Sequence, residues 1–174
     1  MGESGDFLQL ATERYSVRKF SDQEIEKEVL EKILQAGYVA PTACNKQPVR
    51  IMVIKSEEGL KKLYRTTECH FHTKTALLIC YSKKECWKRS YDGKDSGDVD
   101  ASIVTTHMMM EAASLGVGTT WVMYFIPDAV RTEFELPEDL VPAAFLMMGY
   151  PAEDAQPSST HKAYRPMEEM VSFI

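Results

Sequence analysis

Short apolar runs alternate with stretches of helical periodicity along almost the whole chain, and this alternation limits the fold more than any other feature. The runs are rich in aliphatic and β-branched residues, which is typical of buried strands; they cover residues 50–55, 76–81 and 142–150, with a shorter run after Gly118. Helical patterns lie between them, over residues 7–13, 21–39, 57–65, 98–115 and 127–134. This order predicts a sheet covered by helices. The 174 residues suit a single domain, 1–174, with a real core.

Two of the helical patterns carry further predictions. Ser21 and Glu24 form a capping box, which predicts a helix that begins at Ser21 and ends before Pro41. The pattern over 98–115 is apolar nearly all round, which predicts a buried helix. One face of it carries Val99, Ile103, Thr106, Met110 and Ala113. We interpret its methionines as core residues or as contacts with a partner subunit.

Composition excludes several classes of protein. The formal net charge of -6 argues against a general nucleic-acid-binding surface. No run reaches the roughly 18 apolar residues of a membrane span. The acidic stretch Met1–Asp6 lacks the basic and apolar regions of a signal peptide, so we expect a cytoplasmic protein. The four cysteines include no CxxC pair, and we expect no disulfide framework.

Two segments have the side chains of a ligand site. Arg14, Ser16 and Arg18 share one side of an extended segment, where two guanidiniums and a hydroxyl favour an anion. The alternative is an amphipathic edge strand with a solvated basic face. The loop from Pro41 to Pro48 holds two primary amides, Asn45 and Gln47, between two prolines, and it suits a planar ligand with donors and acceptors on its edge. The alternative there is a solvated turn.

Three other features leave more than one interpretation. Cys69, His70 and His72 resemble the start of a zinc site, but no fourth ligand stands at a usual spacing, and we expect no metal. The polar stretch 85–97, with Trp87 as one of two large apolar residues, is interpreted as an excursion of a kind that often binds ligands. The apolar end of the tail, residues 170–174, is able to add a strand to a sheet, in this chain or in a partner.

Taken in order, these segments resemble the FMN-dependent nitroreductase family over almost the whole chain. The resemblance rests on Arg14-x-Ser16-x-Arg18-x-Phe20, Ala40-Pro41-Thr42-x-x-Asn45-x-Gln47-Pro48, Leu115-Gly116-Val117-Gly118 with Trp121, and Gly149-Tyr150-Pro151. The first two motifs, one helix apart, are the most specific. The resemblance implies an α+β, nitroreductase-like fold with a mostly antiparallel or mixed central sheet flanked by helices. It also implies dimer-forming helices, an extended C-terminal tail, and a homodimer with FMN at its interface.

The same resemblance implies a set of FMN-binding residues. Arg14 and Ser16 would contact the phosphate or ribityl chain, and the tail residues Lys162 and Arg165 would complete the phosphate site. Arg18 would approach the flavin N1 and C2 carbonyl, where a cation favours the reduced form. Met123 and Tyr124 would lie near flavin N5, at positions where the family often has an acidic residue and glycine. The remaining residues of the implied site are Tyr15, Pro41, Thr42, Ala43, Asn45 and Gln47.

The implied activity is an oxidoreductase that moves hydride from NADPH or NADH through FMN to a nitroaromatic, quinone or similar small acceptor by a ping-pong mechanism. No protein residue is needed as a nucleophile, and no catalytic triad is present in the sequence patterns. His70, His72 and Trp87 would line the substrate entrance. The alternatives are a flavoenzyme of the same fold with other chemistry, such as reductive dehalogenation or flavin fragmentation, and a non-catalytic flavin- or metal-binding module. The sequence does not choose the acceptor or the nicotinamide donor.

Overall fold

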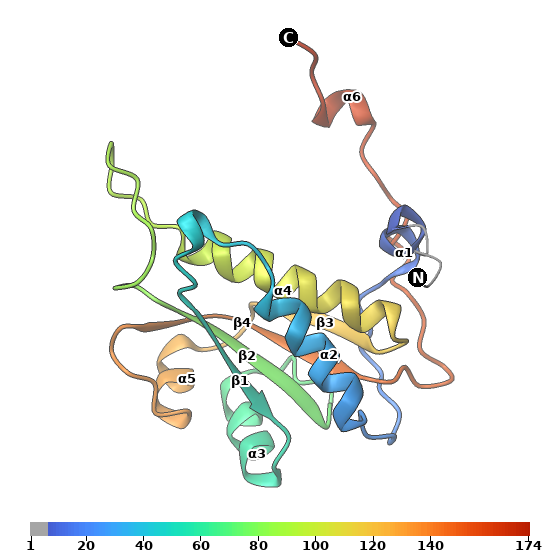
Figure 1. Ribbon diagram of the computed structural model, residues 1–174. Helices are drawn as coiled ribbons and strands as arrows, with labels where there is room; N and C mark the ends of the chain where they lie inside the picture. The colour runs from blue at the N-terminus through green and yellow to red at the C-terminus, as the bar shows by residue number, and fades with distance from the viewer. Residues whose placement is uncertain (1–6) are drawn as a thin grey trace.

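The computed structural model describes residues 7–174, and the Met1–Asp6 stretch considered for a signal peptide lies outside them. Its centre is a four-stranded sheet in the order β1-β2-β4-β3 (Figure 1). The strands are β1 (Val49–Ile54), β2 (Thr75–Ser82), β3 (Gly118–Val122) and β4 (Leu140–Gly149). Every neighbouring pair is antiparallel, which confirms the predicted sheet. β1 and β3 are its two edges.

Helices cover both faces of the sheet, as the alternating patterns predict. α2 (Lys27–Tyr38) and α4 (Gly97–Ser114) lie on one face, and α3 (Glu57–Thr66) and α5 (Pro127–Glu133) lie on the other (Figure 1). Successive residues of β2 alternate between them: Leu77 and Ile79 pack under α2 and α4, while Ala76 and Leu78 pack under α3 and α5. Within residues 7–174, no helix is both long and apolar enough to cross a membrane.

The remaining elements lie at the periphery. α1 (Phe7–Glu13) packs beside the C-terminal half of α4, and the short helix α6 (Met167–Met170) belongs to the tail. A 3-10 turn, η1 (Ala43–Asn45), precedes β1 near the first turn of α4. Figure 1 shows the tail and α1 beyond one end of α4, and the excursion after β2 beyond the other end.

The predicted start of α2 is wrong. The helix begins at Lys27, its N-cap is Glu26, and no side chain caps it. Tertiary contacts hold the preceding segment extended: the Ser21 N–H donates to the Tyr150 carbonyl at 2.8 Å, and the Tyr150 hydroxyl donates to the Glu26 carboxylate. Pairing with the end of β4 therefore overrides the local capping signal.

Within a single chain, α4 is buried on one side only. Its buried side carries small and medium residues such as Ala101, Val104 and Met108. Val99, on the predicted apolar face, is 55% exposed, and Ile103 and Met110 are only half-buried. Both sides of this helix are apolar, but this chain covers only one of them.

Candidate functional site

The Arg14–Phe20 segment lies along the β3 edge of the sheet. Ser16 forms a parallel bridge with Thr119, and the Val17 N–H donates to the Thr119 carbonyl at 2.9 Å. The Thr120 hydroxyl donates to the Val17 carbonyl. Val17 is 2% exposed and packs directly on Gly118, where a Cβ would lie 2.6 Å from Val17 Cγ2. Val17 points inward. Because side chains alternate along an extended backbone, its neighbours Ser16 and Arg18 lie on the other side.

The two arginines of this segment line two different hollows. Arg14 and Tyr15 line a cavity of about 200 Å³ with Gly118 and Thr119. Arg18 lines a second cavity of about 510 Å³, which His70 and His72 also line. Lys19 and Asp154, at its rim, pair at 2.5 Å. The basic side chains therefore face open space in which an anion or a polar ligand has room.

The turn that carries the histidines lies between Arg18 and the end of β3. The Thr67 hydroxyl donates to the Tyr124 carbonyl and accepts from the Cys69 N–H at 3.0 Å. This turn therefore connects the Arg18 cavity to Tyr124, which follows β3 together with Met123. Both of these side chains are exposed. The structure thus brings the Arg14–Arg18 segment, the histidine turn and the end of β3 to one region.

Ring contacts and a hydrogen bond hold the histidine turn. The His70 ring packs on Tyr64 with centroids 4.1 Å apart, and His72 lies edge-on to it at 4.5 Å. The His72 N–H donates to His70 Nδ1 at 3.1 Å, so Nδ1 acts as an acceptor. Burial, and then the neighbouring His72, lower the pKa of His70. Over residues 7–174, no group of three or more His, Cys, Asp or Glu is placed to hold a metal ion.

The Pro41–Pro48 loop is folded tightly on itself and on α4. The Gln47 amide donates to Asn45 Oδ1 at 2.9 Å, and the Gln47 N–H donates to the Thr42 hydroxyl at 3.0 Å. Cys44, Asn45 and Gln47 all have φ near +50°, a conformation that costs free energy unless the surroundings enforce it. The enforcing contact comes from Asp100 in the first turn of α4, whose carboxylate accepts the Ala43 N–H at 2.8 Å.

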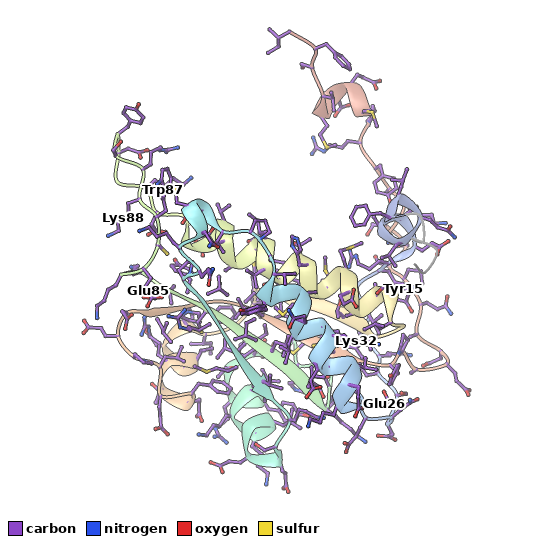
Figure 2. The ribbon with its side chains drawn as sticks, in the orientation of Figure 1. Tyr15, Glu26, Lys32, Glu85, Trp87 and Lys88 are labelled. Carbon is purple, nitrogen blue, oxygen red and sulfur yellow. The ribbon has the colours of Figure 1, made fainter. Side chains whose placement is uncertain are left out.

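The predicted site residues form two separate groups in one chain. The loop with Pro41, Thr42, Ala43, Asn45 and Gln47 leads into β1 beside the first turn of α4, whereas Arg14–Arg18 lies against β3, the opposite edge. Figure 2 shows the same separation: Tyr15 lies near one end of α4, and Glu85 and Trp87 lie near the other. A single chain does not bring the two groups together.

The tail residues join the Arg14 group only in part. The His161 ring approaches Tyr15 with centroids 6.2 Å apart, so Lys162 follows directly after this contact. Arg165 lies further along the exposed tail, and its only described ion pair is with Glu169 at 3.9 Å. The structure therefore supports a place for Lys162 beside the Arg14 segment more directly than for Arg165.

Three residues that position the site were not predicted as site residues. Gly118 permits the approach of Val17, Asp100 shapes the Pro41–Pro48 loop, and Trp121 on β3 has a buried Nε1 with no hydrogen-bond partner within residues 7–174. From the sequence, Gly118 and Trp121 stand out only as parts of a motif, and Asp100 only as one residue of the helical pattern over 98–115. Their roles depend on contacts between segments far apart in the chain, which no local pattern reveals.

Comparison with known proteins identifies the family. The sequence model that describes the nitroreductase family matches this chain over residues 11–74 and 67–150. The chain belongs to the nitroreductase family. A nitroreductase family protein from Clostridium difficile 630 has a crystal structure that is 42% identical, with a TM-score of 0.91, over 97% of this chain and 98% of that one. This nitroreductase therefore has the fold that the motifs implied.

Two further relatives are similar at lower identity. A protein of Methanothermobacter thermautotrophicus with the provisional name NADH dehydrogenase/NAD(P)H nitroreductase is 30% identical over 161 residues, covering 86% of this chain and 79% of its own. A protein of Exiguobacterium sibiricum 255-15, whose crystal structure is in complex with FMN, shares the fold with a TM-score of 0.84 at 21% identity, over 97% of each chain.

Proposed function

We propose that this nitroreductase is an FMN-dependent oxidoreductase that takes hydride from NADPH or NADH and passes electrons to a small nitroaromatic, quinone or similar acceptor. Family membership supports the proposal, as do the NAD(P)H nitroreductase name of one relative and the FMN bound in the structure of another. The four cysteines are free in the structure, and free thiols and a nicotinamide donor suit a cytoplasmic location.

The donor set of the Arg14 group fits FMN. FMN offers phosphate, ribityl and carbonyl oxygens, and this region offers guanidiniums, the Ser16 hydroxyl and the basic Lys162. Trp121 Nε1 is a buried donor without an acceptor within residues 7–174, on the strand that ends just before Met123 and Tyr124. An oxygen-rich ligand or a second chain is the natural source of that acceptor, since buried donors are rarely left unpaired.

The separation of the two residue groups is the observation that carries the proposed assembly. A second copy of the chain would bring its Pro41–Pro48 loop to the Arg14 group of the first, so that two sites form between two chains. The surface agrees with this arrangement: Phe7 and Leu10 of α1 and Thr106 and Met110 of α4 line an open groove of about 310 Å³. A monomer that left this α4 face exposed would carry an apolar patch of a kind typical of interfaces. We infer a homodimer.

In this arrangement, each group of residues has one task. Arg14, Tyr15 and Ser16, with Lys162 and Arg165 from the tail, hold the phosphate end of FMN. Arg18 supplies a fixed cation that favours the reduced, more negative cofactor. The partner's loop, with Pro41, Thr42, Ala43, Asn45 and Gln47, contributes amide and backbone groups, and the Met123 and Tyr124 backbone borders the flavin. FMN itself supplies the redox chemistry by accepting hydride and releasing two electrons.

Steady-state kinetics test the activity. We expect initial rates with NADPH or NADH varied at several concentrations of an acceptor such as menadione to give parallel lines in double-reciprocal plots, as ping-pong turnover does. Lines that intersect would show that donor and acceptor bind together, which would contradict the ping-pong mechanism. Protein that carries no FMN after incubation with it would contradict the whole proposal.

Mixed dimers test whether the sites are shared. We would combine an Arg14→Ala chain with an Asn45→Gly chain, in which glycine tolerates the positive φ of Asn45 and removes only the amide. If each site takes Arg14 from one chain and Asn45 from the other, the mixed dimer has one intact site, and FMN titrates into about half of the sites with wild-type affinity. Weak binding at every site of the mixed dimer would show that each chain forms its own site.

A further inference from the structure

The excursion after β2 is an ordered β-hairpin, which we call the 86–96 hairpin. Lys88 and Asp95 form an antiparallel bridge, the Arg89 N–H donates to the Lys94 carbonyl at 2.9 Å, and the Ser96 N–H donates to the Trp87 carbonyl at 3.0 Å. Gly93, with φ of +74°, closes the turn. Such a structure presents its tip in a defined position rather than as a loose loop.

The base of the 86–96 hairpin is joined to the Pro41–Pro48 loop. Asp100, which is 1% exposed, accepts the Ala43 N–H of the loop with one oxygen and the Ser96 hydroxyl of the hairpin with the other, at 2.8 and 2.7 Å. Arg50, directly after the loop, pairs with Glu85 at 2.6 Å, and its guanidinium also donates to the Gln47 carbonyl. These contacts fix the base of the hairpin relative to the loop.

The hairpin does not serve the Arg14 group of its own chain. Figure 1 shows it projecting beyond the N-terminal end of α4, with α1 beyond the other end. Figure 2 places Trp87 and Lys88 at that projecting end and Tyr15 at the opposite one. If the loop contacts the flavin of a partner, the attached hairpin reaches the same flavin site.

The tip has a chemistry that differs from the rest of the molecule. The 86–96 hairpin holds three basic and two acidic residues, a net charge of +1, in a chain whose net charge is -6. The Arg89 guanidinium is paired with both oxygens of Asp92, at 2.8 and 2.5 Å. Lys88 and Lys94 are exposed, and neither forms an ion pair with another described residue. Tyr91, between them, is 95% exposed.

We propose that the 86–96 hairpin is an acceptor-recognition arm for the partner's flavin site, and that it selects planar aromatic acceptors that carry a negative charge. Lys88 and Lys94 attract the charge, and Tyr91 offers a ring against which a planar acceptor packs. This inference rests on the proposed function, and it adds the class of substrate and the segment that recognises it.

The charge selectivity is tested in the oxidative half-reaction. The FMN-loaded protein is reduced anaerobically with NADPH, then mixed with nitrobenzene or with 4-nitrobenzoate, and the rate constant of flavin reoxidation is recorded for each. In Lys88→Gln and Lys94→Gln, we expect the ratio of the 4-nitrobenzoate to the nitrobenzene rate constant to fall roughly two- to fivefold each, the size of one exposed charge interaction. Lys32→Gln, an exposed lysine on α2, is the matched control, and its ratio should equal that of the wild type.

The role of the ring is tested in the same assay. Tyr91→Ala should slow reoxidation by both acceptors by roughly two- to tenfold, whereas Tyr91→Phe, which retains the ring, should not. Ratios and rates equal to wild type in the two lysine variants and in Tyr91→Ala would overturn the inference. That result differs from failure of the proposed function, in which the protein would lack FMN or would not be reduced before any acceptor is added.

A mixed dimer tests whether the arm acts on the partner. One chain carries Lys88→Gln and Lys94→Gln, and the other carries Arg14→Ala; with no more than one FMN added per dimer, the cofactor occupies mainly the site that has the intact Arg14 of the first chain. An arm that acts across the interface gives this flavin a wild-type hairpin, and the wild-type rate ratio is expected. The lowered ratio of the lysine variants would show that each hairpin serves its own chain, and it would overturn the inference.

Discussion

Substituting Gly118 tests how the Arg14–Phe20 segment is held. In Gly118→Ala the new Cβ would lie 2.6 Å from Val17 Cγ2 and 2.9 Å from Val17 Cβ, distances that real Cβ atoms do not show. Val17 is 2% exposed, and its Cβ as well as its Cγ2 would overlap the new methyl group, so a change of rotamer alone does not relieve the clash. Overpacking of this kind costs about 1–3 kcal/mol. A glycine replaced by alanine at an unstrained position would instead gain about 0.4–1 kcal/mol.

The clash is relieved only if the segment moves away from β3. That movement would weaken two hydrogen bonds, from the Val17 N–H to Thr119 and from the Thr120 hydroxyl to Val17. At about 0.5–1.5 kcal/mol each, they match the cost of the clash. Because Arg14 and Ser16 move with Val17, FMN affinity should fall by up to the same free energy, roughly five- to 140-fold.

A double-mutant cycle tests whether the clash with Val17 causes both losses. Denaturant unfolding gives the stability, and quenching of FMN fluorescence gives the affinity, for Gly118→Ala, Val17→Ala and the double variant. Val17→Ala alone removes buried methyl groups and should cost about 1.5–3 kcal/mol. In the double variant the 2.6 Å overlap with Cγ2 is gone and only the 2.9 Å approach to the Cβ of residue 17 remains, so the total cost should be clearly smaller than the sum, and FMN affinity should recover in part. Additive costs, or affinity that stays low in the double variant, would refute the reasoning.

Three further predictions concern single side chains. Arg14→Ala should weaken FMN binding by about 1.5–3 kcal/mol through loss of a charge-assisted phosphate contact, and equal FMN retention on dilution would contradict this role. Arg18→Ala should make the flavin harder to reduce with a smaller effect on retention, and a wild-type reduction potential would remove Arg18 from its proposed role. The pKa of His70 is lowered in the folded chain by burial and by His72, so the unfolded chain binds more protons, and the folded state should lose stability as pH falls below the ordinary histidine value of about 6.5. His70→Phe retains a ring against Tyr64 and should lose less stability than the wild type between about pH 8 and pH 5, a window that spans the ordinary histidine pKa. Parallel pH profiles of the two proteins in denaturant unfolding would contradict this role of His70.

The elements that the sequence predicts correctly are those with strong local periodicity. Six of the eight residues of β2 are apolar, and the strand is buried along its whole length. Pro127 stands in the first turn of α5, at the start of the predicted helical pattern over 127–134, and Gly116, with φ of +75°, follows the predicted pattern over 98–115. These features depend on residues close together in the chain, and local physical chemistry is enough to determine them.

The errors arise where distant contacts override local ones. The capping box at Ser21 does not form, because the Ser21 N–H pairs with the Tyr150 carbonyl instead. α4 is partly exposed because no described residue of this chain covers its second apolar side. The motifs did identify two groups of candidate residues. Their placement at opposite edges of the sheet depends on the strand order, which the sequence patterns do not contain.

The central claim is that this nitroreductase carries FMN that a nicotinamide donor reduces. The most direct test is the visible absorption spectrum of the purified, FMN-incubated protein, recorded before and after anaerobic addition of NADPH and then, in a separate sample, NADH. The account predicts a flavin band that bleaches with at least one donor and returns when an acceptor such as menadione is added. A flavin band that neither donor bleaches, or a protein that retains no flavin, would contradict it.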